Sequence, residues 1–337
     1  MLSLLASIYG KFADARNRLY ERGVFETHDL GARAISIGNI TTGGTGKTPL
    51  VTHVAGILAT RGEKVCILTR GYGRENSNRR ILVSDGDNVL ANVGEAGDEP
   101  FELANKLLGK AIVIADGDRV AAAEWAKRRF GVMAFVLDDG FQHRKARRDV
   151  DIVCIDATNP FGDGKMLPAG RLREPLHNLK RADAIVITRA NLSENIADLR
   201  FEISNLAPHT PIFEAENTIS NIIAIEGYPA KPQRTQSIEI KERVFAFCGI
   251  GNPTNFTNSL VAENIDVASS SDFPDHHHYK QEDIARVEQL AKQSGAKALV
   301  TTAKDAVKLS NLKFEIPLYV VEIEMKLDDE GAFAAML

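Results

Sequence analysis

A glycine-rich segment between a short β-type run and a helical run carries the strongest chemical signal in the chain. Residues 34–38 read AISIG, residues 39–48 read NITTGGTGKT, and a helical pattern follows to about residue 59. Glycines let backbone N–H groups approach phosphate oxygens, and the N-terminus of a helix adds the positive end of its dipole. The pattern G-x-x-x-x-G-K-[ST] is met except that Thr41 replaces the first glycine. We therefore predict a variant phosphate loop made of Thr41, Thr42, Gly43, Gly44, Thr45, Gly46, Lys47 and Thr48.

Two residues of this loop predict ATP and Mg²⁺ as ligands. A lysine at the position of Lys47 can reach the β- and γ-phosphates of a nucleotide. A hydroxyl at the position of Thr48 can bind the Mg²⁺ that accompanies those phosphates. A chance glycine-rich turn is the alternative, but strand, loop and helix follow one another in the required order.

An acidic strand end fits the same machinery. Residues 135–139 read FVLDD, an apolar run that ends in two carboxylates, as a Walker B strand does. Asp138 or Asp139 would hold Mg²⁺, directly or through water. Turn chemistry is the alternative for such a pair. Gln142 and His143 follow closely, at the carboxyl end of the sheet where open α/β folds bind ligands.

Two further segments offer candidate bases. Asp98 stands in GDEP just before a helical stretch, where it could equally be an N-cap. Residues 275–278 read DHHH, which resembles a metal-binding tract. Three adjacent histidines on regular structure cannot all face one ion, so we expect a single functional histidine beside Asp275.

Short apolar runs that alternate with helical stretches must position these groups. Near-continuous Val and Ile runs are typical of buried parallel strands. They predict a mostly parallel α/β sheet flanked by helices, of the P-loop NTPase type, with a smaller C-terminal α/β subdomain. The predicted segments are an amphipathic helix at 1–25, the P-loop core at 26–220, a linker or hairpin at 221–242 and the C-terminal subdomain at 243–337.

Composition excludes several classes of protein. The 337 residues predict about two domains. A net charge of −4 gives no electrostatic case for a nucleic-acid partner. The mean hydropathy is −0.15, and the longest apolar runs stop far short of the roughly 18–20 residues that span a bilayer. The three cysteines form no CxxC pair, so buried thiols are expected rather than disulfides or a zinc site.

The N-terminal 22 residues predict an amphipathic helix. At 100° per residue one face is apolar, and the opposite face carries charged and amide side chains. Two interpretations stay open at this point: the apolar face docks on the protein's own core, or it lies in a membrane interface. The apolar face comprises Leu4, Leu5, Ile8, Tyr9, Phe12, Ala15 and Leu19.

A set of short motifs, in fixed order, resembles the tetraacyldisaccharide 4′-kinase family over roughly residues 1–325. The phosphate loop alone is shared by many families, but VLDDGFQHR together with GDEP and LPAGRLRE is far more specific. The motifs are TTGGTGKTP, TRGYGR, GDEP, DGDR, VLDDGFQHR, MLPAGRLREP, ITR, FCGIGNP, FPDHHHY and TTAKDAVK.

This resemblance implies an ATP-dependent kinase that phosphorylates a lipid A precursor. The acceptor would be the 4′-hydroxyl of an acylated glucosamine disaccharide 1-phosphate. The N-terminal helix would hold the protein on the cytoplasmic face of the bacterial inner membrane, as a peripheral or monotopic protein. No obligate protein partner is implied.

The resemblance also implies roles for single residues. Asp98 would be the general base, and His276 would orient it or tune its pKa. Lys47 and Mg²⁺ would stabilise the transferring phosphoryl group. Asp139, Gln142 and His143 would shape the site between metal and acceptor, and Lys304 and Asp305 would lie near the nucleotide. Expected substrate contacts are Arg70, Arg74, Arg119, Arg171 and Arg173 for anions and Glu174 for sugar hydroxyls.

A membrane-associated ATPase switch with a deviant Walker A loop is the competing hypothesis. Such switches also combine a phosphate loop with an amphipathic membrane helix. Their signature lysine would precede Gly43, where this chain has Thr42, and their membrane helix is typically C-terminal. Both departures favour the kinase.

Overall fold

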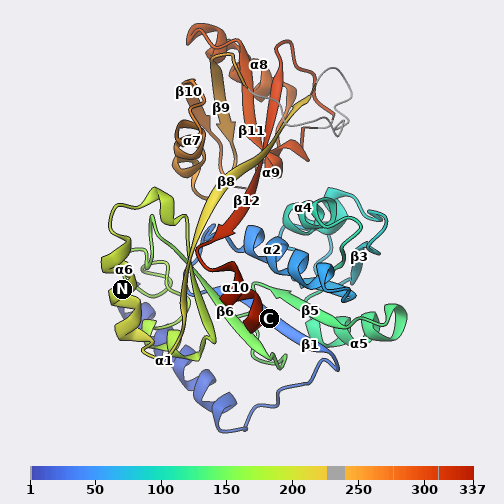
Figure 1. Ribbon diagram of the computed structural model, residues 1–337, viewed down its shortest axis with the longest axis vertical. Helices are drawn as coiled ribbons and strands as arrows, with labels where there is room; N and C mark the ends of the chain where they lie inside the picture. The colour runs from blue at the N-terminus through green and yellow to red at the C-terminus, as the bar shows by residue number, and fades with distance from the viewer. Residues whose placement is uncertain (1, 226–239, 276, 310) are drawn as a thin grey trace. The chain divides into compact units, whose positions relative to one another are not determined.

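Residues 2–225, 240–275, 277–309 and 311–337 are described by the computed structural model (Figure 1). They form two compact units: the first comprises Met1–Glu216 and Met325–Leu337, and the second comprises Asn217–Glu324. The predicted C-terminal subdomain at 243–337 therefore differs from the second unit, because the last segment of the chain belongs to the first. Of the predicted linker at 221–242, residues 226–239 lie outside the described residues.

The first unit contains a mostly parallel sheet, which confirms the predicted fold class. The strand order is β8-β7-β6-β1-β5-β2-β4-β3, and β3 pairs antiparallel with β4. The other pairings within this unit are parallel. The strands are β1 (Arg33–Asn39), β2 (Val65–Thr69), β3 (Ile81–Ser84), β4 (Ala111–Ala115), β5 (Ala134–Asp138), β6 (Val150–Asp156), β7 (Ala184–Thr188) and β8 (Ile212–Ile225).

Helices cover both faces of this sheet, which explains why its strands read as continuous apolar runs. Alternate residues point to opposite faces: Ile35 and Ile37 of β1 join the core under α2, whereas Ala34 joins the core under α5. Phe333, fully buried in α10, packs edge-on against Phe213 of β8. The helices are α2 (Lys47–Thr60), α3 (Val93–Ala96), α4 (Asp98–Lys106), α5 (Arg119–Phe130), η1 (Leu176–Arg181), η2 (Ala190–Leu192), α6 (Ile196–Leu206) and α10 (Glu330–Met336).

Parallel pairing brings the chemically active loops to one edge of the sheet. β1 lies between β5 and β6, and Ile37 of β1 is in register with Asp138 of β5. The segments that follow β1, β5, β2 and β7 therefore leave the sheet at the same edge. The segments after β1 and β5 are the ones that the sequence singled out for phosphate and metal chemistry.

The second unit is a smaller α/β assembly. Its strands follow the order β10-β9-β11-β12, with parallel pairing throughout this series. By their residue ranges, β8 and β12 each extend across the boundary between the two units. Its remaining elements are β9 (Val244–Cys248), α7 (Pro253–Ala262), β10 (Val267–Asp272), α8 (Gln281–Gln293), β11 (Ala298–Thr302), α9 (Ala303–Ala306) and β12 (Leu318–Leu327).

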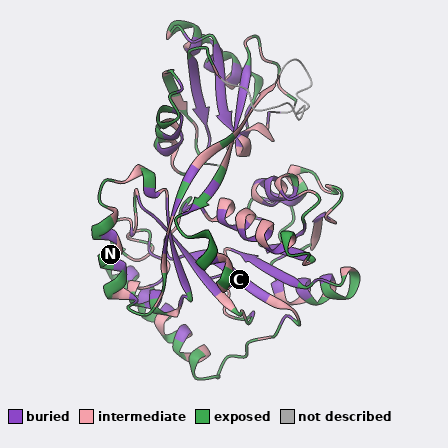
Figure 2. Ribbon diagram, in the orientation of Figure 1, coloured by how far each residue is buried: buried purple, intermediate pink, exposed green. Residues whose placement is uncertain are grey.

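The N-terminal helix α1 (Leu2–Glu21) docks on the first unit through a face that the sequence did not single out. Its buried residues are Ala6, Gly10, Ala13 and Asn17, spaced as one helical stripe. The predicted apolar face is exposed instead: 67% of the surface of Leu4 and 69% of the surface of Phe12 are accessible to solvent. Figure 2 colours the chain by this exposure. Within the described residues, no helix is both long and apolar enough to cross a bilayer.

Polar contacts hold the second half of α1 in place. The Asn17 amide donates to the Glu174 carboxylate at 2.6 Å, and Arg181 donates to the same carboxylate at 2.8 Å. Asp14 lies 3.1 Å from both His177 Nε2 and Asn178 Nδ2. Small side chains let the helix approach closely, and these polar groups fix its position.

Gly10 provides a sharp test of this docking. A Cβ atom there would lie 3.5 Å from Met166 Cγ, an ordinary contact, so Gly10→Ala should leave α1 docked. Gly10→Leu would overfill the interface, and overpacking costs about 1–3 kcal/mol. We expect tryptic cleavage at Arg18 to accelerate about 5- to 30-fold in Gly10→Leu only. Equal cleavage rates in the two variants would show that α1 does not dock through this stripe.

Candidate active site

The phosphate loop, residues 41–48, connects β1 to α2. Gly46 adopts a left-handed backbone (φ 78°) immediately before the first helical residue, Lys47. A Cβ atom at Gly46 would lie only 3.1 Å from the Thr188 side chain, so conformation and space both require glycine there. Because α2 begins at Lys47, the positive end of its dipole faces the loop.

The first limb of the loop is fixed by the segment 171–173. The Thr42 amide donates to the Arg171 carbonyl, and the Arg173 amide donates to the Ile40 carbonyl, both at 2.8 Å. The Asn39 amide donates to Thr45 Oγ1 at 2.8 Å. The two backbone hydrogen bonds fix the chain on either side of Thr41, which replaces the usual first glycine.

The two carboxylates at the end of β5 have different partners. Asp139 has a left-handed backbone (φ 51°), and its Oδ1 lies 3.7 Å from Lys47 Nζ. Arg173 binds both of its oxygens, at 2.7 and 3.1 Å. Asp138 instead accepts from the Thr69 hydroxyl at 2.9 Å. The sequence could not distinguish these two roles.

Their electrostatics differ accordingly. Burial, together with the negative charges of Glu99 and Asp139, raises the pKa of Asp138 to about 6. Burial also opposes ionisation of Asp139, but Lys47 and Arg173 outweigh it and lower the pKa of Asp139 to about 2. Cations of the protein therefore neutralise Asp139, whereas a bound cation would stabilise the ionised form of Asp138.

The residues around Asp138 suit Mg²⁺. Within the described part of the chain, no cluster of three His, Cys, Asp or Glu side chains could hold a metal by itself. Mg²⁺ commonly uses one or two carboxylates together with phosphate oxygens and water. Asp138 offers one carboxylate, and Glu99 lies close enough for its negative charge to act on Asp138. Sequence reasoning missed Glu99, although GDEP contains it directly after Asp98.

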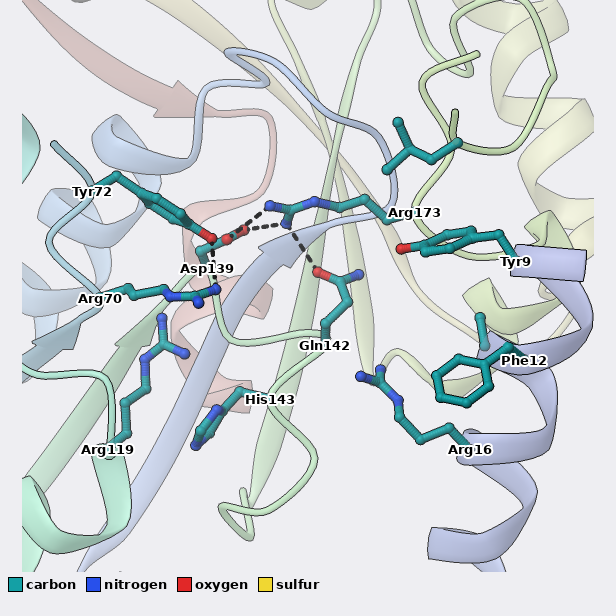
Figure 3. A pocket seen from close by; sticks show the side chains of 12 residues that line it. Tyr9, Phe12, Arg16, Arg70, Tyr72, Arg119, Asp139, Gln142, His143 and Arg173 are labelled. Carbon is teal, nitrogen blue, oxygen red and sulfur yellow. Dashed lines mark hydrogen bonds and ion pairs between the residues drawn. The ribbon is translucent and has the colours of Figure 1, made fainter. Parts of the chain in front are cut away.

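A pocket of about 410 Å³ opens beside this site (Figure 3). Arginine side chains and His143 line one part of it, and α1 contributes aromatic rings. Predicted residues that meet here are Arg70, Arg119, Asp139, Gln142, His143 and Arg173, and residues that sequence reasoning missed as lining are Tyr9, Phe12, Ala13, Arg16, Tyr72 and Leu167.

Hydrogen bonds fix the polar wall of the pocket. Arg173 donates to Gln142 Oε1 at 3.0 Å, and Gln142 donates to the Asn39 carbonyl at 2.9 Å. Arg70 donates to the Tyr72 hydroxyl at 3.1 Å. In Figure 3 the Arg173 guanidinium lies between Asp139 and Gln142. The wall is thus pre-organised, with cations directed at a common space.

Other predicted residues lie elsewhere. Arg74 is buried and donates to the carbonyls of Ser77, Arg79 and Ala115, so it shapes its own loop. Glu174 is fully buried beneath α1. A Cβ atom at Gly43 would lie 3.9 Å from Arg171 Nη1, which places Arg171 beside the phosphate loop.

The predicted bases are described only in part. Asp98 is buried at the start of α4. His276 lies outside the described residues. In the second unit Lys304 pairs with Asp275 at 2.9 Å, and Asp305 accepts from the Gly249 amide at 3.0 Å. The roles given to these residues stay predictions.

His143 predicts a measurable pH dependence. Burial, then Arg119 and Arg148, lower the pKa of His143 to about 4 from 6.5. As the pH falls from 6.5 to 4, the unfolded chain binds a proton at this histidine and the folded protein does not. The free energy of unfolding therefore decreases as the pH falls. Glutamine does not titrate, so the free energy of unfolding of His143→Gln should fall by on the order of 2 kcal/mol less than that of the parent over this pH range. Urea titrations at each pH measure it. Parallel curves for the two proteins would contradict the burial of a neutral imidazole.

Comparisons with known proteins identify the family to which this chain belongs. The family model described as "Tetraacyldisaccharide-1-P 4'-kinase" matches residues 1–337. A tetraacyldisaccharide 4'-kinase from Halothermothrix orenii is 39% identical over 97% of this chain and 88% of its own length. One from Geobacter metallireducens is 38% identical over 98% and 94%. The crystal structure of "apo" form LpxK from Aquifex aeolicus in complex with ATP superposes with a TM-score of 0.76 at 29% identity, covering 98% of this chain and 96% of that one. The predicted resemblance is confirmed: this chain belongs to the tetraacyldisaccharide-1-phosphate 4'-kinase family.

Proposed function

We propose that this protein transfers the γ-phosphate of ATP to the 4′-hydroxyl of a tetraacyl glucosamine disaccharide 1-phosphate, a late step of lipid A biosynthesis. One observation carries the proposal. Asp139 contacts Lys47 of the phosphate loop, and it also lines the arginine-rich pocket. A phosphate donor and an anionic acceptor would therefore meet at one carboxylate. Family membership supplies the chemical identity of the acceptor.

The phosphate loop would bind the nucleotide. Its backbone N–H groups and Lys47 would contact the phosphates, with Thr48, Asp138 and Glu99 as the groups that would hold Mg²⁺. When bound, Mg²⁺ neutralises charge on the β- and γ-phosphates. Asp138 is suited to this role because its carboxylate accepts a hydrogen bond from the neutral Thr69 hydroxyl, whereas Asp139 is already paired with Arg173.

Cations of the pocket would bind the acceptor. Arg70 and Arg119 line it with Arg16 of α1, and a guanidinium suits the two oxygens of a phosphate. His143 is neutral near pH 7, since its pKa is about 4, so it would act as a hydrogen-bonding group rather than as a cation. These groups would fix the sugar phosphate while the reacting hydroxyl points toward Asp139.

Asp98 is proposed as the general base, with His276 as its partner. Asp98 is buried and precedes Glu99, whose charge acts on Asp138. This neighbourhood supports a position close to the transferring group. A carboxylate that accepts the hydroxyl proton in the transition state makes a sugar alcohol an effective nucleophile.

The exposed face of α1 is proposed to bind the inner membrane at its cytoplasmic side. Leu4, Leu5 and Ile8 are exposed, and Tyr9 and Phe12 of the same helix line the pocket. Amphipathic helices bury such faces at the boundary of headgroups and acyl chains. A lipid acceptor could then enter the pocket along α1 without leaving the bilayer surface. An ATPase switch would not need a pocket for a phosphate acceptor.

Kinase assays on Asp98→Asn test the chemistry. With the unsubstituted protein, we expect label from the γ-phosphate of ATP to appear on the tetraacyl disaccharide 1-phosphate in mixed micelles. Loss of a general base lowers turnover about 10²- to 10⁴-fold, whereas the Kd for ATP should stay unchanged. Asp87→Asn, at an exposed carboxylate, is the matched control. Full turnover by Asp98→Asn would remove its role, and ATP hydrolysis without lipid product would favour the switch.

Vesicle flotation tests the membrane proposal. The double variant Leu4→Glu/Ile8→Glu adds two charges to the apolar face of α1. Each buried aliphatic side chain contributes about 1.5–3 kcal/mol, so binding to anionic phospholipid vesicles should fall at least about tenfold. Ser3→Glu/Ser7→Glu adds the same charge to exposed positions away from that face, and it should bind more tightly than the first variant. Equal binding by the two variants would exclude the apolar face as the membrane contact.

A further inference from the structure

We propose that Thr188 and Arg189 are positioning residues of the phosphate loop. They hold the carbonyls of Gly44 and Thr45 away from the nucleotide, so that the N–H groups of Thr45 and Gly46 face its phosphates. Both residues lie at the end of β7, outside the G-x-x-x-x-G-K-[ST] pattern. The inference rests on the proposed function in one respect, namely that the loop binds ATP.

Two hydrogen bonds carry the inference. Arg189 Nη1 donates to the Gly44 carbonyl at 2.9 Å, and Thr188 Oγ1 donates to the Thr45 carbonyl at 2.9 Å. Thr188 is fully buried, and the Thr45 carbonyl lies nearer to its hydroxyl than the Ile155 carbonyl, which is 3.4 Å away. The side chains of Thr188 and Arg189, consecutive residues at the end of β7, therefore fix two consecutive carbonyls of the loop.

Peptide geometry converts these bonds into an orientation of the amides. A trans peptide unit is planar, and its C=O and N–H bonds point in opposite directions. A carbonyl of Gly44 turned toward Arg189 thus turns the N–H of Thr45 the other way. The same holds for the carbonyl of Thr45 and the N–H of Gly46. Amides aligned in this manner form the concave anion site of a phosphate loop.

Arg189 is itself held in an unusual conformation. Its backbone is left-handed (φ 58°), which is uncommon for a residue with a Cβ atom. Its guanidinium also pairs with Asp156, whose carboxylate accepts from the Thr158 hydroxyl at 2.8 Å. Strained backbones persist where surrounding contacts fix them, and Arg189 is fixed here by both Asp156 and the Gly44 carbonyl.

The second limb of the loop needs this support. Its first limb is bonded to residues 171–173, and the Thr42 amide already donates to the Arg171 carbonyl. That amide is thus used within the protein and does not face a phosphate. The remaining amides of the loop must supply the anion contacts, and those of Thr45 and Gly46 are the ones whose carbonyl neighbours are fixed by Thr188 and Arg189.

Nucleotide binding by Thr188→Val and Arg189→Met tests the inference. Valine keeps the shape of threonine without the hydroxyl, and methionine keeps the length of the arginine stem without the donors. Each lost hydrogen bond should weaken ATP about tenfold, measured by displacement of a fluorescent ATP analogue. AMP, which lacks the β- and γ-phosphates, should be weakened less than twofold or so. The KM for the lipid acceptor should not change.

Three controls separate positioning from a structural role. Thr188→Ser restores the hydroxyl and should restore ATP affinity. Arg200→Met removes an arginine that pairs with Glu214 on the surface, and it should bind ATP as the parent does. Thermal melts report whether each variant folds. Unchanged ATP affinity in both test variants, or equal losses for ATP and AMP, would overturn the inference. Because binding is measured without acceptor, a failure to phosphorylate lipid would count against the proposed function alone.

Discussion

The shared carboxylate of Asp139 is the interaction on which the rest of the site depends. Lys47 approaches it from the phosphate loop, and Arg173 binds it from the pocket wall. Without this negative charge, two cations would face each other in a partly buried space, where screening by water is weak. The backbone at Asp139 is left-handed, and the carboxylates of Asp138 and Asp139 have different partners. One carboxylate at this strand end thus binds the fixed cations of the protein, and the other is the one proposed to hold Mg²⁺.

Arg173 and Glu174 are a second pair of consecutive residues that bind different parts of the protein. Arg173 points to Asp139, whereas Glu174 is buried and binds Asn17 of α1 and Arg181. A buried ion pair contributes little net stability, but removal of one partner is strongly destabilising. Its geometry therefore specifies where α1 lies with respect to the pocket more than it adds to the free energy of folding.

Local patterns predicted the core of the site, and long-range packing decided the rest. The strand, glycine-rich loop and helix around Lys47 are contiguous in sequence, so their order alone placed them correctly. The periodicity of α1 revealed an apolar face but not the docking face, because Ala6, Gly10 and Ala13 give no hydrophobic signal. Likewise Arg74 and Glu174 were predicted as substrate contacts, since nothing local shows that their partners bury them. The return of Met325–Leu337 to the first unit was equally invisible, because chain order does not reveal it.

The docking of α1 also bears on how the rate would respond to substrate. One helix carries both pocket residues and the face proposed to rest on lipid, so encounter with the acceptor becomes diffusion in two dimensions. The relevant concentration is then the mole fraction of acceptor within the surface, not its amount per volume. Added inert lipid or detergent would dilute the acceptor at constant bulk concentration, and turnover would follow the composition of the interface.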